Sequence, residues 1–177
     1  MLKLNYNMWK WIIIAGFARI WKTTLAKKYI NVSDIESTPY KYDYSELNNY
    51  NTEEVKGKEW RNLNKDFPTN YINAIKKAQK EFDIVLVRIH PEEALPQYDK
   101  NWIDYYLCFP TKEALNEYEI RFRKRWNNET YIRKVIDSYD KRYQQFKNNP
   151  HKKIELSIWE TLEDALVKLG FPLIQKK

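Results

Sequence analysis

The sequence predicts an α/β fold of three layers, in which a parallel sheet of about five strands lies between helices on both faces. Short apolar runs of strand length alternate along the chain with segments whose apolar residues recur at helical spacing. This alternation is typical of strand–helix–strand units, whose strands run parallel. A length of 177 residues with 43% hydrophobic residues is enough for one core. We therefore expect a single domain over residues 1–177.

Five apolar runs are the predicted strands. The run at 83–89 is apolar almost without a break, which is typical of a central strand that is covered on both faces. The next run stops at Pro110, because proline lacks the N–H that a ladder requires. The predicted strands are residues 12–15, 29–35, 83–89, 103–109 and 153–157.

Five amphipathic segments are the predicted helices. Pro68 suits the first turn of a helix, where a backbone N–H is not needed, and Thr111 suits an N-cap. The apolar positions from 131 to 146 predict one long helix. The helices are predicted to begin at residues 22, 68, 111, 131 and 162.

Polar side chains gather where the predicted strands end. In parallel α/β sheets, ligands bind at the carboxyl ends of the strands. Gly16, Asp34, Glu36, His90 and the segment after Pro110 are all predicted to lie at that edge. We therefore expect the functional site there.

The segment at 16–24 has the pattern of a phosphate-binding loop with one departure. The motif G-x-x-x-x-G-K-[ST] needs glycine before its lysine, and this chain has tryptophan there. The lysine would reach the β- and γ-phosphates of a nucleotide, and the threonine hydroxyl would bind Mg²⁺. An isoleucine-rich strand that merely precedes a basic helix is the less favoured interpretation. The predicted nucleotide-binding residues are Gly16, Phe17, Ala18, Arg19, Ile20, Trp21, Lys22, Thr23 and Thr24, with Thr23 as the metal ligand.

Trp21 is predicted to block or distort this loop. Glycine at that position lets the main chain approach a phosphate closely, whereas an indole has a Cβ and two rings in the same space. The chain as written is therefore expected to bind ATP weakly.

A second cluster of basic residues lies at 118–130, where we expect a lid. Arg121 and Arg125 are i,i+4 neighbours on a helix, so both could hold phosphate oxygens on one face. A solvated basic face is the alternative interpretation. Beside a phosphate-binding loop, the clamp is the favoured one.

Charge and composition limit the classes of partner and compartment. The balance of 31 Lys+Arg against 24 Asp+Glu gives a net charge of +7, which suits a phosphorylated ligand or nucleic acid. The basic residues are dispersed without a recognition motif, so nucleic acid is disfavoured. The lone Cys108 indicates a reducing compartment, and the apolar run near residue 12 is too short to span a membrane. We expect a cytoplasmic protein.

The chain resembles the P-loop kinases of the nucleoside-monophosphate-kinase-like superfamily, and within it small members found in phage genomes. The loop is the specific feature. The resemblance rests on five segments, which are residues 16–24, 34–37, 66–75, 90–92 and 118–125. His90 and Pro91 stand where the superfamily usually has Asp-Gly, so the acceptor is left open.

The resemblance implies an ATP- and Mg²⁺-dependent phosphotransferase that acts on a nucleotide or another small acceptor. It implies that Lys22 acts on the phosphates, that Asp34 or Glu36 faces the acceptor, and that Arg121 and Arg125 belong to the lid. A phage gene would place the protein in the host cytoplasm. The alternative is a catalytically inactive P-loop fold that serves as a ligand- or protein-binding module.

Four tryptophans stand where the family pattern favours glycine. They are Trp21, Trp102, Trp126 and Trp159. The chain has 3 glycines and 7 tryptophans, whereas an average composition would give about 12 glycines. We hypothesise that some or all of these codons are UGA and are read as glycine in the native host. The rivals are a pseudokinase that has lost its site and a natural protein in which Trp21 packs in an empty loop.

Overall fold

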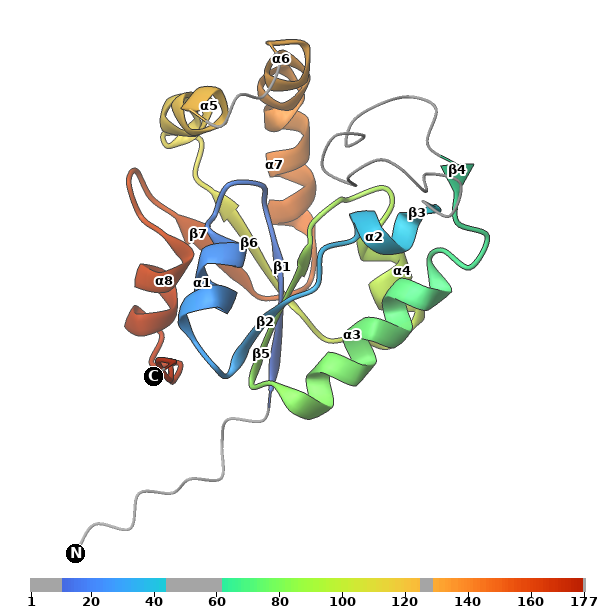
Figure 1. Ribbon diagram of the computed structural model, residues 1–177. Coiled ribbons are helices and arrows are strands. Elements are labelled where there is room, and N and C mark those ends of the chain that lie inside the picture. Colours follow the sequence, from blue (N-terminus) through green and yellow to red (C-terminus); the bar gives the residue numbers. More distant parts are fainter. Residues whose placement is uncertain (1–10, 44–61, 125–128, 177) are drawn as a thin grey trace, which may run out of the picture.

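Figure 1 shows the computed structural model, which describes residues 11–43, 62–124 and 129–176. Within these ranges, five strands form one sheet in the order β2-β5-β1-β6-β7, and every neighbouring pair is parallel. Two further short strands, β3 and β4, pair antiparallel outside that sheet. The strands are β1 (Ile12–Gly16), β2 (Val32–Asp34), β3 (Tyr42–Asp43), β4 (Asn62–Leu63), β5 (Ile84–Arg88), β6 (Tyr106–Pro110) and β7 (Lys153–Leu156).

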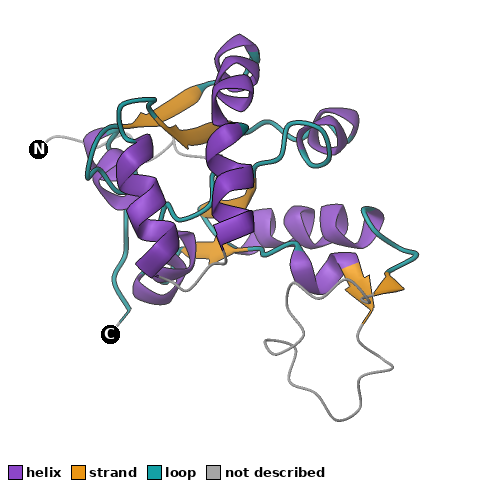
Figure 2. Ribbon diagram, turned by 90° about the horizontal axis from the view of Figure 1, so that it is seen from above, coloured by secondary structure: helices purple, strands orange, loops and turns teal. Residues whose placement is uncertain are grey.

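Helices cover both faces of this sheet, with α1 and α8 on one side and α3, α4 and α7 on the other (Figures 1 and 2). Helices α5 and α6 lie beyond the carboxyl edge of the strands. The predicted three-layer α/β class is confirmed. The helices are α1 (Lys22–Lys28), α2 (Thr38–Lys41), α3 (Thr69–Glu81), α4 (Leu95–Lys100), α5 (Leu115–Lys124), α6 (Glu129–Asp137), α7 (Tyr139–Asn148) and α8 (Leu162–Lys168).

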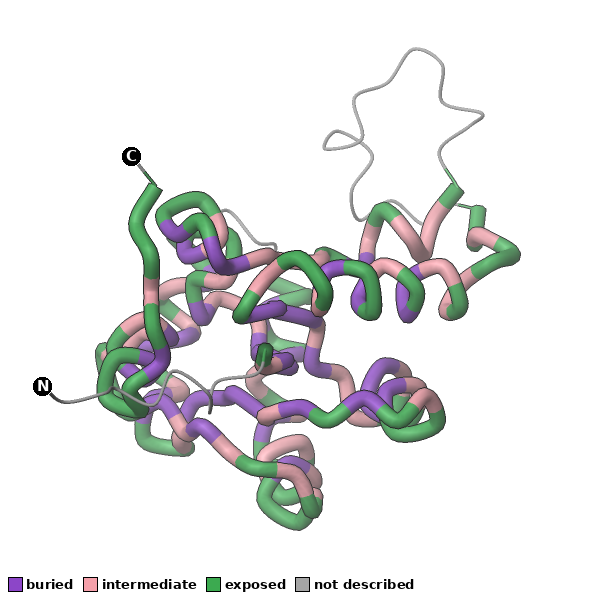
Figure 3. The backbone as a smooth tube through the Cα atoms, turned by 90° about the horizontal axis from the view of Figure 1, so that it is seen from below, coloured by how far each residue is buried: buried purple, intermediate pink, exposed green. Residues whose placement is uncertain are grey.

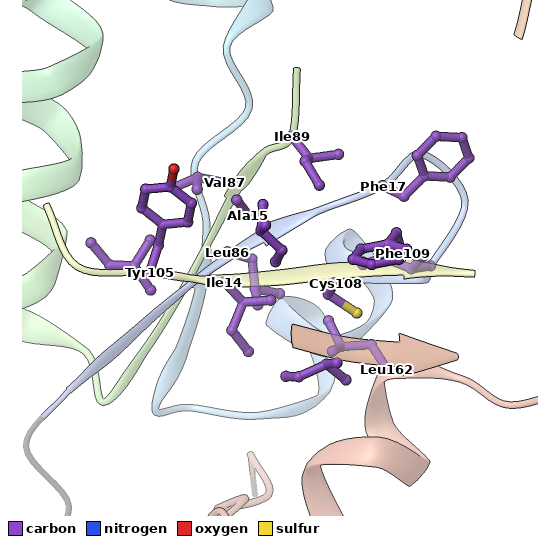
Figure 4. Close-up of a cluster of buried hydrophobic side chains, with 14 of the residues drawn as sticks. Ile14, Ala15, Phe17, Leu86, Val87, Ile89, Tyr105, Cys108, Phe109 and Leu162 are labelled. Carbon is purple, nitrogen blue, oxygen red and sulfur yellow. The ribbon is translucent and has the colours of Figure 1, made fainter. Parts of the chain in front are cut away.

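The core lies on both faces of the central strands. Side chains from β1, β5, β6 and α8 come together there, among them Ile14, Leu86, Cys108 and Leu162 (Figure 4). Figure 3 shows the same pattern along the chain, with buried residues in the sheet and exposed residues on the outer sides of the helices. Burial raises the pKa of the Cys108 thiol, which is therefore a small core residue and no nucleophile.

Several boundaries differ from the sequence prediction, and β6 begins at Tyr106 instead of residue 103. Strand β2 covers only Val32–Asp34, because Tyr29 is the C-cap of α1 and forms an isolated bridge with Gln175. Helix α5 begins at Leu115, since the backbone N–H of Thr111 donates to Leu156 O at 2.8 Å and prolongs the pairing of β6 with β7.

The predicted long helix at 131–146 is two helices, α6 and α7, which meet at Ser138. The Ser138 hydroxyl donates to Lys134 O at 2.6 Å. Such a bond from serine to the preceding turn competes with the regular ladder and bends helices. The prediction of a single helix is therefore wrong, because the helix is interrupted at Ser138.

The carboxyl edge of the sheet is where the chain leaves β1, β2, β5 and β6 for the loops and for α5 (Figure 1). In the described ranges no helix is long and apolar enough to cross a membrane. The assignment of all 177 residues to one domain stays a prediction.

Candidate functional site

The loop that follows β1 is anchored in the core. Phe17 and Ile20 are both buried, so the loop is tied down at two points. A Cβ on Gly16 would come within 2.5 Å of the Ile20 side chain. A larger residue at the start of the loop would therefore require the terminal methyl group of Ile20 to move.

Lys22 is folded back into the loop that precedes it. Its ammonium donates to Gly16 O at 3.0 Å and to Phe17 O at 2.9 Å. Burial lowers the pKa of Lys22, and the nearby carboxylate of Asp34 opposes that effect. The lysine is thus a desolvated cation with its charge held at the mouth of the loop, where the predicted role in phosphate binding requires it.

Asp34 comes to the loop from the end of β2. The Thr23 hydroxyl donates to Asp34 Oδ2 at 2.7 Å, so the predicted metal ligand and the predicted acceptor residue are in direct contact. Burial raises the pKa of Asp34 above its ordinary 3.8, against the opposing effects of the Thr23 hydrogen bond and the Lys22 charge. Oxygen donors of this kind suit a hard divalent cation.

Trp21 has the left-handed backbone conformation that glycine favours, with φ 71° and ψ 25°. The residue is 41% exposed and lines the adjoining cavity. That Trp21 blocks or distorts a nucleotide-binding loop stays a prediction.

The lid is described only in part. Arg121 is ion-paired with Glu117 one turn earlier, and its side chain is 11% exposed. It also donates to Arg19 O at 3.4 Å, which brings α5 onto the loop. The second predicted lid residue, Arg125, lies outside the described residues, so the clamp as a pair is untested. Arg123 does not line the cavity and pairs with Glu129, which agrees with the alternative interpretation of a solvated basic face.

A cavity of about 700 Å³ joins the loop, the β2 edge and α5. Small-molecule sites are commonly about 300–1,000 Å³. It contains most of the predicted site residues. Its lining residues are Ala18, Arg19, Trp21, Lys22, Thr23, Thr24, Asp34, Ile35, Glu36, Ser37, Thr38, Arg88, Arg121, Lys124, Tyr131, Trp159 and Thr161.

Two further charged residues, Arg88 and Lys124, line the cavity, and Arg88 went unnoticed in the sequence. Arg88 is the last residue of β5, and its side chain is 3.4 Å from Glu93 Oε2. Lys124 ends α5 and faces the same cavity. The rule that ligands gather at carboxyl ends of strands could have found Arg88. His90, which that rule did select, does not line the cavity, and burial lowers its pKa.

Comparisons with known proteins agree with this fold. No protein-family model and no curated sequence matches the chain. One solved structure that matches the chain is that of the tunicamycin resistance protein of Deinococcus radiodurans, with a TM-score of 0.53 and 15% sequence identity. The match covers 93% of this chain and 98% of that one. This likeness shows the fold. At this identity it shows nothing of the substrate, and the activity of the chain has to be argued from the site itself.

Proposed function

We propose that this chain is an ATP-dependent phosphotransferase of the nucleotide-kinase-like class, active when residue 21 is glycine. The observation that carries the proposal is the convergence of Lys22, Thr23 and Asp34 at one end of a cavity of about 700 Å³. A lysine, a hydroxyl and a carboxylate are the groups that P-loop kinases use on a nucleotide, a magnesium ion and an acceptor.

The loop at 16–24 would hold the phosphates of ATP, with Lys22 on the β- and γ-phosphates. In the described part of the chain no group of three His, Cys, Asp or Glu side chains could hold a metal alone. Mg²⁺ would therefore arrive with the nucleotide and bind through phosphate oxygens and Thr23, as this ion commonly does. When bound, ATP supplies the γ-phosphoryl group, and the metal neutralises its charge.

Asp34 would accept the proton of the acceptor hydroxyl. The hydroxyl oxygen forms a bond to the γ-phosphorus, the bond from phosphorus to the bridging oxygen breaks, and ADP leaves. Arg88 and Glu36 line the same cavity on the acceptor side, so an acceptor with both a hydroxyl and an anionic group suits it. A nucleotide has this chemistry. Tunicamycin belongs in the panel of acceptors, because the similar structure is that of a resistance protein for it.

The alternative is a catalytically inactive P-loop fold that binds a ligand or a protein. One observation favours it for the chain as written, which is the exposed indole of Trp21 at the cavity wall. The two functions differ in a single outcome. The inactive fold would not transfer phosphate even after Trp21→Gly.

We propose that the protein acts in the cytoplasm, or in the host cytoplasm if the gene is phage-borne. The dispersed basic residues and net charge of +7 favour an anionic small molecule over nucleic acid. The single buried cysteine suits a reducing compartment.

The test is a phosphoryl-transfer screen of the Trp21→Gly protein with labelled ATP, Mg²⁺ and a panel of nucleosides, nucleotides and small alcohols. We expect transfer to at least one acceptor, and its loss on Lys22→Ala. Lys141→Ala is the charge-matched control, since Lys141 is 75% exposed and lies outside the cavity. Equal activity of the Lys22→Ala and Lys141→Ala forms would contradict the proposed role of the loop.

A further inference from the structure

Three tryptophans of this chain have a backbone that favours glycine. Trp21, Trp102 and Trp159 have φ of 71°, 58° and 61°. A positive φ occurs in a few per cent of non-glycine residues and is an outlier for bulky ones. In the described ranges, Arg19 is the only other non-glycine residue with a positive φ, and nothing in the structure explains it.

Trp102 is at the end of α4, where glycine normally stops a helix. Its backbone N–H donates to Asp99 O at 3.1 Å, and the N–H of Ile103 donates to Tyr98 O at 3.0 Å. These two bonds define the Schellman motif, in which the residue after the C-cap is left-handed and is usually glycine. The side chain of Trp102 is 95% exposed, so it stabilises nothing by burial.

The end of α8 has the same motif with a real glycine. Gly170 has φ 76°, and its N–H donates to Val167 O at 3.0 Å. The N–H of Phe171 donates to Leu166 O at 3.0 Å. The hydrogen bonds and the backbone of Trp102 thus match those of a glycine elsewhere in the same chain.

Trp159 is in the turn that follows β7. The N–H of Glu160 donates to Ser157 O at 3.1 Å, so Trp159 is the third residue of a four-residue turn. Ile158, the second residue, has no positive φ, which makes the turn one of type II. That type requires a positive φ at the third residue and therefore favours glycine. Trp159 is 65% exposed.

Trp21 is the third case. It is the N-cap of α1, and its own backbone has the left-handed conformation. The four tryptophans in the described ranges include Trp11, which has no positive φ. If each had a chance of about 3 per cent, three of four would have a positive φ on the order of one time in ten thousand. The three are the described members of the set that the family pattern selected. Trp126 lies outside the described residues.

We infer that the functional protein has glycine at 21, 102 and 159, and that the gene encodes each as UGA. UGA differs by one base from the glycine codon GGA and by one base from the tryptophan codon UGG, so a single decoding rule accounts for all three positions. A pseudokinase that had lost its site could explain Trp21 and Trp159, which both line the cavity. It would not explain tryptophan at the end of α4, which is not part of the cavity lining. This inference does not depend on the proposed activity.

The codons in the gene are the direct test. We expect UGA at 21, 102 and 159 and UGG at 11, with glycine at 102 in the protein recovered from the cells that carry the gene, measured by peptide mass spectrometry. A UGG codon at 21, 102 or 159 overturns the assignment for that position. UGA at codon 11, or tryptophan at 102 in the native protein, overturns the decoding rule.

Thermal unfolding of purified variants tests the same claim through the backbone. Trp102→Gly should raise Tm by about 2–4 °C, because it removes the steric strain of a residue with a Cβ in the left-handed conformation. Trp102→Ala keeps a Cβ and should gain less. Gly170→Ala is the reciprocal control: an added Cβ there has nothing within 4 Å, so its expected loss of Tm reports the positive φ alone. Equal shifts for Trp102→Gly and Trp102→Ala, or a lower Tm for Trp102→Gly, would refute the inference.

Discussion

At the scale of single residues, the site depends on charges that the fold has partly removed from water. Lys22 and Asp34 are both partly buried beside the cavity, and this burial shifts the pKa of each toward its neutral form. Groups with such shifts near a cavity are common at functional sites. The hydroxyl of Thr23 lies between the loop and β2 and joins the two elements that carry these charges.

The raised pKa of Asp34 has a consequence for stability that can be measured. A carboxyl with a raised pKa in the folded state binds protons more tightly there than in the unfolded chain, so its contribution to the free energy of unfolding falls as pH rises. The loss begins near 3.8, the ordinary value, and ends above the folded pKa. Asp34→Asn should remove this dependence.

Urea unfolding of both proteins over a pH series, with the exposed Asp104→Asn as the control, would measure that change. The free-energy difference between the wild type and Asp34→Asn should fall with rising pH, and by more than the difference between the wild type and Asp104→Asn. A difference for Asp34→Asn that instead rises with pH would show that hydrogen bonding outweighs burial at this carboxyl.

At the scale of elements, the sequence predicted the strands and the loop well because their signals are local. Residues 84–88 are apolar without a break until Arg88, and the motif around Lys22 requires a strand before it and a helix after it. The break at Ser138 could not be seen in the sequence, since the apolar spacing continues across it. Arg88 was missed because the sequence does not show which charged strand end faces a cavity.

Helix α8 begins with a capping box, which was not predicted from the sequence. The Thr161 hydroxyl accepts from the Asp164 N–H at 3.2 Å, and the Asp164 side chain accepts from the Thr161 N–H at 2.8 Å. Thr161→Ala should lower the free energy of unfolding by about 1 kcal/mol. Thr161→Ser keeps the hydroxyl and should cost much less. Urea unfolding checks both, and equal losses would mean that the methyl group and not the cap is responsible.

Helix α5 carries Arg121, the described residue of the predicted lid, and Glu117 holds it in an ion pair. The same carboxylate accepts the N–H of Trp159, so one buried Glu117 joins the lid to the loop after β7. In the Trp21→Gly background, Arg121→Ala should lower turnover by about 10²-fold and weaken ATP binding less, because the contact acts on charge that develops during transfer.

Steady-state kinetics, compared with Lys141→Ala as the charge-matched control, would show whether Arg121 acts on turnover. If Arg121→Ala and Lys141→Ala lose the same activity, Arg121 contributes only to the general positive field, and its assignment to the lid would be wrong.

At the scale of the whole molecule, a parallel sheet brings together groups that are far apart in sequence. Lys22 and Arg121 line one cavity although they lie on different elements, and Asp34 reaches it from a third. The net charge of +7 adds a field that attracts phosphates. The sequence showed the groups and their common edge. It could not show the cavity, because a cavity depends on how α5 and the loop after β7 pack against that edge.

The proposed activity requires this fold to bind ATP once residue 21 is glycine. Calorimetry with ATP and Mg²⁺ on the chain as written, on Trp21→Ala and on Trp21→Gly tests it most directly. Trp21→Gly should bind about tenfold tighter or more, a difference of about 1.4 kcal/mol, with Trp21→Ala between the two because it removes the indole but keeps the Cβ. Equal affinity of all three proteins for ATP would contradict the account.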